Sequence, residues 1–189
     1  MAGKAFRGDA ARAAGIMAVD TETTGLTPAA ADLVGISICV DPGHAGYIPL
    51  GHQAGGDLFG DAAAPSVQQL PVADVMAAMK AVMEDKSILK IGHNFKFDYQ
   101  FFAAHGVRPF PMHDTMLMSY VLYNSASSHG LSDLSQRLLG VTGISYDDVT
   151  GTGKNRITFD RVSIDKARDY AAEDADFTRR LYDVLAPAL

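Results

Sequence analysis

Short apolar runs separated by turn residues predict a β-sheet in the first part of the chain. Residues 16–19, 33–40 and 46–50 are rich in β-branched and other apolar side chains, as strands are. The tripeptide Asp41-Pro42-Gly43 lies between the last two runs and is a typical turn sequence, so we expect those two strands to form an antiparallel pair. The Gly-, Ala- and Asp-rich stretch 54–66 that follows predicts a loop.

Apolar residues at helical spacing dominate the remainder of the chain. Residues 71–84 have this pattern, with a proline at an early position that helices tolerate and with Met76, Met79 and Met83 on a stripe that we expect to face the core. Asp114 precedes another such segment and is a typical N-terminal cap. In all, we expect helices at residues 71–84, 94–104, 115–123, 131–139 and 164–185, a further strand at 87–91, and an irregular segment at 141–155.

This order of elements favours one α/β domain. Strands followed by a helix–strand–helix unit and further helices indicate a mixed β-sheet flanked by α-helices. The length of 189 residues and the 48% hydrophobic content allow one domain with a core, which we place at residues 16–189. Residues 1–15 are Ala-rich and weakly basic, so we expect an N-terminal tail or the cut end of a longer chain.

Charge and cysteine content exclude some classes of protein. The formal net charge of -6 argues against a protein that binds duplex DNA by broad neutralisation of its phosphates, although a small metal-dependent site can still hold a few nucleotides. The single cysteine, Cys39, excludes an internal disulfide, fits a reducing compartment and lies in an apolar run typical of a core strand. We find no apolar segment typical of a membrane span, and therefore expect a soluble, intracellular protein without a membrane partner.

Two acids end the first apolar run. Asp20 and Glu22 are two positions apart, and side chains at that spacing point to the same face of a strand. Like charges on one face repel, and burying them unpaired is costly. We therefore expect a cation between them.

Two later segments repeat this concentration of polar groups. Asn94 and Asp98 are four residues apart on an expected helix, and so are Tyr170 and Asp174, so each pair shares a helix face. Carboxylates without His or Cys partners suit hard cations such as Mg²⁺ or Mn²⁺. Two such ions can clamp the attacking and leaving oxygens of a phosphodiester.

Each of these motifs also has an ordinary explanation. A pair such as Asp20 and Glu22 is often a solvated strand end, and Asp98 beside Lys96 can be a surface ion pair. Asp114 is a better candidate for a helix cap than for a fifth ligand. The histidines show no metal-ligand spacing and are expected to be structural or solvated (His44, His52, His93, His105, His113 and His129).

The combination of the three motifs is far more specific. DTETTGL, GHNFKFD and YAAEDAD resemble the three exonuclease motifs of the DEDD superfamily of 3′–5′ exonucleases, and Tyr170 four residues before Asp174 marks the tyrosine subclass. Similarity to the proofreading domains of bacterial family A DNA polymerases (the Klenow type of DNA polymerase I) extends through HDTMLMSYVL, LSDLSQRLLG and GTGKNRITF. The resemblance implies a ribonuclease H-like fold.

The resemblance also implies roles for the motif residues. Asp20, Glu22, Asp98 and Asp174 would hold two divalent ions, Mg²⁺ or Mn²⁺, with Asp98 acting through the water shell of the second ion. Tyr170 would orient the attacking water. The implied reaction is hydrolysis at the 3′ end of single-stranded or frayed DNA, with release of 5′-mononucleotides.

Further positions match the family's contacts to the 3′-terminal nucleotides. These are Thr23, Leu26, Asn94 and Phe97, with Leu26 wedged against the terminal base and Asn94 hydrogen-bonded to the strand. Phe97 stands where the family often has Tyr, and Ser128 where its best-known members carry a DNA-binding Arg. We also interpret the loop containing Lys154 and Arg156 as one that approaches the strand.

The resemblance implies a setting and leaves two alternatives. We expect a bacterial, cytoplasmic and nucleoid-associated protein whose partners are a DNA 3′ end and a polymerase domain outside this sequence. One alternative is a ribonuclease D-like enzyme that trims RNA 3′ ends. The other is an inactive module that binds single strands beside a polymerase, which the complete set of carboxylates disfavours.

Overall fold

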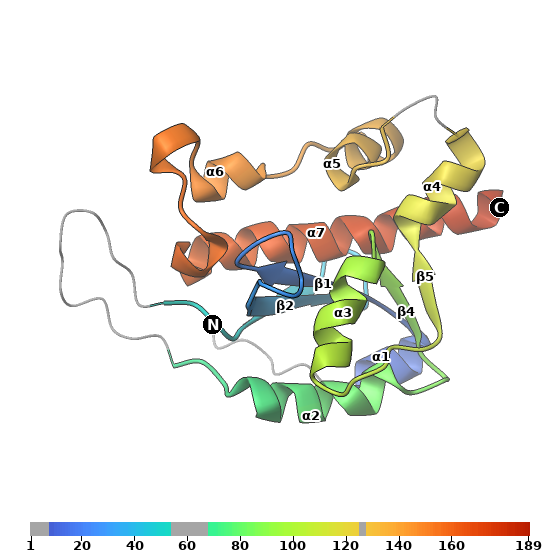
Figure 1. The fold of residues 1–189 in the computed structure, drawn as a ribbon. Coiled ribbons are helices and arrows are strands. Elements are labelled where there is room, and N and C mark those ends of the chain that lie inside the picture. Colours follow the sequence, from blue (N-terminus) through green and yellow to red (C-terminus); the bar gives the residue numbers. More distant parts are fainter. Residues whose placement is uncertain (1–7, 54–67, 125–127) are drawn as a thin grey trace.

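A five-stranded mixed sheet forms the centre of the molecule (Figure 1). The computed structural model describes residues 8–53, 68–124 and 128–189, so the loop expected at 54–66 lies outside the described residues. The strand order is β3-β2-β1-β4-β5; β1 pairs antiparallel with β2 and β2 with β3, whereas β4 is parallel to both β1 and β5. The strands are β1 (Ile16–Thr23), β2 (Leu33–Cys39), β3 (Ala45–Pro49), β4 (Leu89–Gly92) and β5 (Met112–Asp114).

The central strand β1 presents two different faces. Met17 and Val19 belong to the large core cluster shared with α2 (Val72–Met83), whereas Ala18 packs against Ala175 of α7 (Ile164–Leu185). This alternation follows from the two-residue period of a strand. The same alternation sets the direction of the acids at the end of β1.

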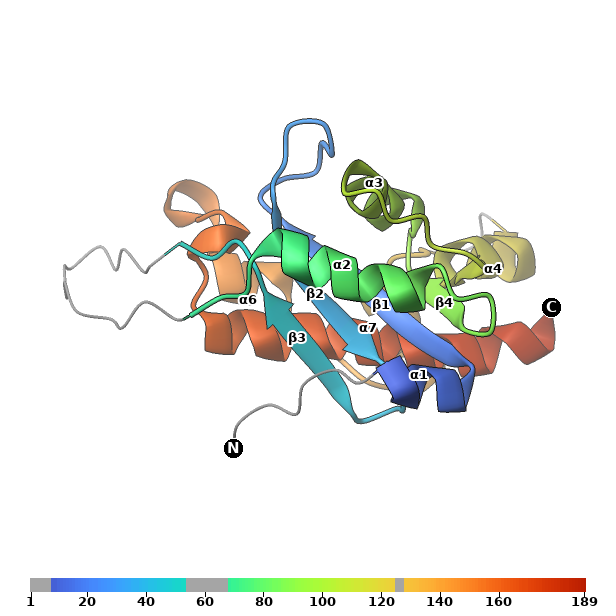
Figure 2. The same ribbon diagram turned by 90° about the horizontal axis from the view of Figure 1, so that it is seen from below.

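Helices cover both faces of the sheet (Figures 1 and 2). The long helix α7 crosses one face and contacts β1, β2, β3 and β4. On the other face, α1 (Gly8–Ala14), α2 and α3 (Lys96–Ala104) share the large core cluster, in which Met76, Met79 and Met83 are buried as the sequence predicts. The expected α/β sandwich of a mixed sheet and flanking helices is therefore confirmed.

The chain between β5 and α7 packs along the length of α7. It contains α4 (Thr115–Tyr123), α5 (Leu131–Leu134), which runs on into a π-helical turn at Ser135–Leu139, and α6 (Tyr146–Thr150). Met118 and Leu134 from this region join Leu181 and Leu185 of α7 in a second core cluster. The helix expected at 131–139 is thus divided into an α-helical and a π-helical part.

Several elements differ from the sequence expectation. Residues 8–14, expected in a terminal tail, form α1, because the fully buried Ala11 packs into the main core. The short β5 was not predicted, since three residues carry too little periodicity to be recognised. The segment 141–155 was expected to be irregular, yet it contains α6, which a capping box between Ser145 and Asp148 starts.

The remaining expectations concern Cys39 and the membrane. Cys39 is free and buried on β2, as predicted. Among the residues that the structure describes, none of the helices combines the length and the apolar character that crossing a bilayer requires.

Candidate active site

The structure brings three carboxylates from two elements together. Asp20 and Glu22 leave β1 on the face that α7 covers, and Asp174 comes from α7 itself. Each offers an oxygen, and these oxygens all lie within 4.8 Å of one another. The expectation that the two strand acids share a face is met, and α7 adds the third acid because it crosses the sheet above them.

Asp98 approaches from the opposite layer. It lies in the first turn of α3, is only 2% exposed, and accepts two hydrogen bonds at Oδ1 from Thr21, one from the backbone N–H at 2.9 Å and one from the hydroxyl at 2.6 Å. Thr21 points away from Asp20 and Glu22, so it connects the two layers at the end of β1. Asp98 is not part of the group of three within 4.8 Å, which agrees with an outer position in the site.

Burial raises the pKa of all four acids, and the charges of neighbouring acids raise it further for Glu22, Asp98 and Asp174. Burial raises the pKa of Asp20 to about 7. The pKa of Glu22 rises well above its usual range through burial and then through the charges of Asp20, Asp174 and Asp98. For Asp98 and Asp174 the causes are burial and then the charge of Asp20. A divalent cation would reverse this repulsion, and a donor set made of carboxylate oxygens fits Mg²⁺ or Mn²⁺.

Tyr170 completes this group from α7. Its hydroxyl donates a hydrogen bond to the carboxylate of Asp174, one helical turn later, and burial followed by the charge of Asp174 raises its pKa. Its ring centroid lies 5.8 Å from Phe159 and 6.1 Å from Tyr146. Neither of these two aromatic residues belongs to the three motifs predicted from the sequence. The capping box that begins α6 is the signal that places Tyr146 on an ordered element.

The corner between β4 and α3 differs from the sequence expectation. Asn94 has a φ of 63° and precedes α3, so it does not share a helix face with Asp98. Asp114 holds this corner, because its two carboxylate oxygens accept the backbone N–H groups of Asn94 at 3.0 Å and Phe95 at 2.8 Å. The same side chain caps α4 through Met116, which confirms Asp114 as a helix cap.

The family model for 3′–5′ exonuclease matches residues 9–189. The chain belongs to the 3′–5′ exonuclease domain family of DNA polymerase I. It is 46% identical over 189 residues to DNA polymerase I of Rhizobium leguminosarum and 38% identical over 174 residues to that of Pseudomonas aeruginosa, covering 95% and 90% of this chain. It spans only about 18% of the length of either relative.

Solved structures place the fold of this exonuclease domain among nucleases. NrnC from Brucella melitensis with bound Mg²⁺ is 26% identical, with a TM-score of 0.63 over 92% of this chain and 72% of NrnC. Ribonuclease D of Escherichia coli is 21% identical, with a TM-score of 0.62 over 95% of this chain and 41% of the ribonuclease, a likeness of fold alone. The ribonuclease H-like architecture expected from the resemblance is therefore confirmed.

The predicted substrate contacts of the exonuclease domain have different surroundings. Leu26 is 92% exposed just beyond β1, whereas Phe97 is half-buried with its ring centroid 5.3 Å from that of Phe101. The hydroxyl of Thr23 donates to the carbonyl of Gly25 and so shapes the turn that carries Leu26. Their contacts to nucleotides stay predictions.

The basic loop is partly occupied by internal contacts. Arg156 forms an ion pair with Asp147, and its guanidinium lies 5.9 Å from the ring centroid of Tyr146. Lys154 is exposed. Arg156 therefore packs on an aromatic residue that itself contacts Tyr170.

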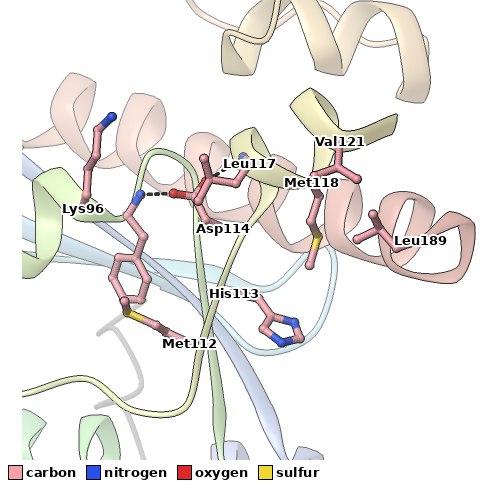
Figure 3. Close-up of a pocket in the computed structure, with 9 residues that line it drawn as sticks. Lys96, Met112, His113, Asp114, Leu117, Met118, Val121 and Leu189 are labelled. Atoms are coloured by element: carbon pink, nitrogen blue, oxygen red, sulfur yellow. Dashed lines mark hydrogen bonds between the residues drawn. The ribbon is translucent and has the colours of Figure 1, made fainter. Parts of the chain in front are cut away.

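An apolar groove lies apart from the four carboxylates (Figure 3). It runs between β5 and α4, where Asp114 binds the backbone of Phe95, and Leu117 and Val121 of its lining are exposed. None of the four acids lines it.

Proposed function

We propose that this exonuclease domain removes nucleotides one at a time from the 3′ ends of single-stranded or frayed DNA with the help of two divalent ions, Mg²⁺ or Mn²⁺. The observation that carries the proposal is the group formed by Asp20, Glu22 and Asp174, with oxygens within 4.8 Å of one another, and Asp98 held beside it by Thr21. Glu22 is buried and Asp20 and Asp174 are half-buried, and acids at this spacing with so little solvent are costly unless a cation neutralises them.

The residues divide the work of hydrolysis. Asp20, Glu22 and Asp174 would hold the ions, and Asp98 would support them from the α3 side. Bound ions of this kind lower the pKa of a water and stabilise a leaving oxyanion. Tyr170, fixed by its bond to Asp174, orients the water that attacks the terminal phosphorus. The new bond joins the water oxygen to phosphorus, and the bond to the 3′ oxygen of the preceding nucleotide breaks, which releases a 5′-mononucleotide.

A free 3′ end suits the surface around this site. Leu26 projects beside the end of β1, and Tyr146, 39% exposed, offers a second apolar surface near Tyr170. Bases stack on such side chains without sequence preference, and a base must leave its duplex to do so. This favours single-stranded or frayed ends as the substrate.

We further propose that the domain proofreads beside a polymerase domain in the bacterial cytoplasm. The relatives at 46% and 38% identity are DNA polymerases I, and the chain spans about 18% of each, which supports a polymerase domain in the same polypeptide. The ribonuclease D-like alternative has only a likeness of fold in its favour.

The test is a gel assay with matched 5′-labelled single-stranded DNA and RNA, with Mg²⁺ or Mn²⁺. We expect a ladder that shortens from the 3′ end of DNA and is absent with EDTA or with Asp174→Ala. Asp165→Ala is the matched control, because Asp165 is an exposed acid on the same helix. Preference for RNA would favour the trimming enzyme, and no cleavage of either strand by the folded protein would favour the inactive module.

A further inference from the structure

The hydroxyl of Tyr47 lies beside the strand position of Glu22. Gly35 of β2 pairs directly with Glu22 of β1, and cross-strand partners share a face of the sheet. A Cβ atom on Gly35 would lie 2.1 Å from the Tyr47 hydroxyl oxygen, so the phenol covers the space that Gly35 leaves empty. The charge of Glu22, after burial, contributes to the raised pKa of Tyr47. Tyr47 is therefore a neighbour of the predicted metal ligand Glu22.

His52 determines the direction of the Tyr47 proton. Nδ1 of His52 lies 3.0 Å from the carbonyl oxygen of Val162, and a carbonyl can only accept, so Nδ1 carries the hydrogen. Burial lowers the pKa of His52 and favours the neutral ring, whose Nε2 is then an acceptor. The Tyr47 hydroxyl, 2.7 Å from Nε2, must donate its single proton to His52.

The surroundings hold His52 firmly in this orientation. Gln69 binds the backbone of His52 twice, accepting its N–H at 2.8 Å and donating to its carbonyl at 2.7 Å. His52 is only 8% exposed. The centroid of its ring lies 6.1 Å from that of Phe159, and Phe159 in turn packs on Tyr170. His52 therefore contacts Tyr47, the neighbour of Glu22, and Phe159, the neighbour of Tyr170.

A phenol that donated to Glu22 would oppose cation binding. The hydrogen bond would stabilise the cation-free carboxylate and occupy an oxygen that a divalent ion needs. With its proton directed at His52, Tyr47 presents only oxygen lone pairs on its other side.

We propose that His52 is a positioning residue of the exonuclease, which accepts the Tyr47 proton and so leaves both oxygens of Glu22 free for a divalent cation. The inference rests on the proposed metal site. It assigns a role to a histidine that is expected from the sequence to be structural or solvated.

The test measures Mn²⁺ affinity by calorimetry on the full 189-residue chain, without any assay of activity. His52→Phe keeps a ring against Phe159 but removes the acceptor, and we expect Mn²⁺ to bind on the order of tenfold more weakly as Tyr47 turns to Glu22. Adding Tyr47→Phe to that variant removes the competing donor, so the double variant should recover the wild-type affinity. His52→Gln, which retains an acceptor, should bind like the wild type.

Unchanged affinity in folded His52→Phe, or no recovery in the double variant, would overturn the proposal. The ring tautomer offers a second measurement on the wild-type protein, by the ¹⁵N chemical shifts of His52. A hydrogen on Nε2 instead of Nδ1 would contradict the proposal even if His52→Phe does not fold. Failure of the proposed metal site itself looks different, because wild type and Asp174→Ala would then bind Mn²⁺ equally or not at all.

Discussion

Thr21 donates two hydrogen bonds to one oxygen of Asp98, from its backbone N–H at 2.9 Å and from its hydroxyl at 2.6 Å. The two residues are 77 positions apart in the chain and belong to different layers of the fold. Asp20 and Glu22 point to the face of the sheet that α7 covers, whereas Thr21 points to the face that carries α3. Thr21 therefore fixes Asp98 of α3 next to the strand that carries the two acids.

We predict that Thr21→Val weakens both the fold and the activity. The buried Asp98 would lose a hydroxyl donor, which costs about 1–3 kcal/mol of unfolding free energy, and its carboxylate would be less well placed. Urea denaturation and the DNA cleavage assay measure the two effects. Thr21→Ser keeps the hydroxyl and should retain most activity; equal activity of the Val variant would show that Asp98 needs no such anchor.

The metal-free protein should lose stability as the pH rises from about 4 to about 7. The pKa of Asp20 is raised from 3.8 to about 7 in the folded state, so within this range the folded protein binds more protons than the unfolded chain and stability falls with pH. Unfolding free energies measured in EDTA across this range test the sign. Saturating Mg²⁺ should remove much of the loss at neutral pH, because the cation stabilises the charged acids.

Asp20→Asn should stabilise the metal-free protein at neutral pH while abolishing cleavage. The substitution removes a half-buried charge that repels Glu22 and Asp174, and we expect a gain of roughly 2 kcal/mol. Thermal unfolding in EDTA and the gel assay provide the two readings. If Asp20→Asn instead lowered the stability of the metal-free protein, repulsion between the acids would not destabilise the fold.

Gly35→Ala should disturb the Tyr47 side chain and destabilise the protein by about 2 kcal/mol. The added Cβ would lie 2.1 Å from the Tyr47 oxygen, far inside van der Waals contact. Gly46→Ala on the neighbouring strand is the matched control, because no atom lies within 4 Å of its added Cβ. Equal melting temperatures for the two variants would contradict the tight contact.

Leu26→Ala should reduce DNA cleavage without affecting the fold. Leu26 is 92% exposed, so its removal should change the unfolding free energy by less than about 0.5 kcal/mol. A raised KM for single-stranded DNA is the expected result, since a stacking surface for the terminal base is lost. Leu70→Ala is the control, because Leu70 is 62% exposed and is distant from the four acids in the sequence. This variant should leave KM unchanged.

Local periodicity accounts for the parts of the site that the sequence predicts correctly. The two-residue period of a strand places Asp20 and Glu22 on one face, and the near-four-residue period of a helix places Tyr170 over Asp174. The strands β1, β2 and β3 and the helices α2 and α7 follow from the same kind of pattern. These relationships depend on neighbouring residues only, and the sequence determines them by itself.

The packing of distant elements decides the rest. Asn94 leaves the expected helix because Asp114, twenty residues later, binds its backbone. Asp98 is held at the site by Thr21. The Tyr47 hydroxyl lies over Gly35, the strand partner of Glu22, and contacts His52. Such contacts join segments that are far apart in the sequence, so the local period of a strand or a helix does not predict them. They depend on how helices lie across the two faces of the sheet, so only the tertiary structure determines which side chains meet.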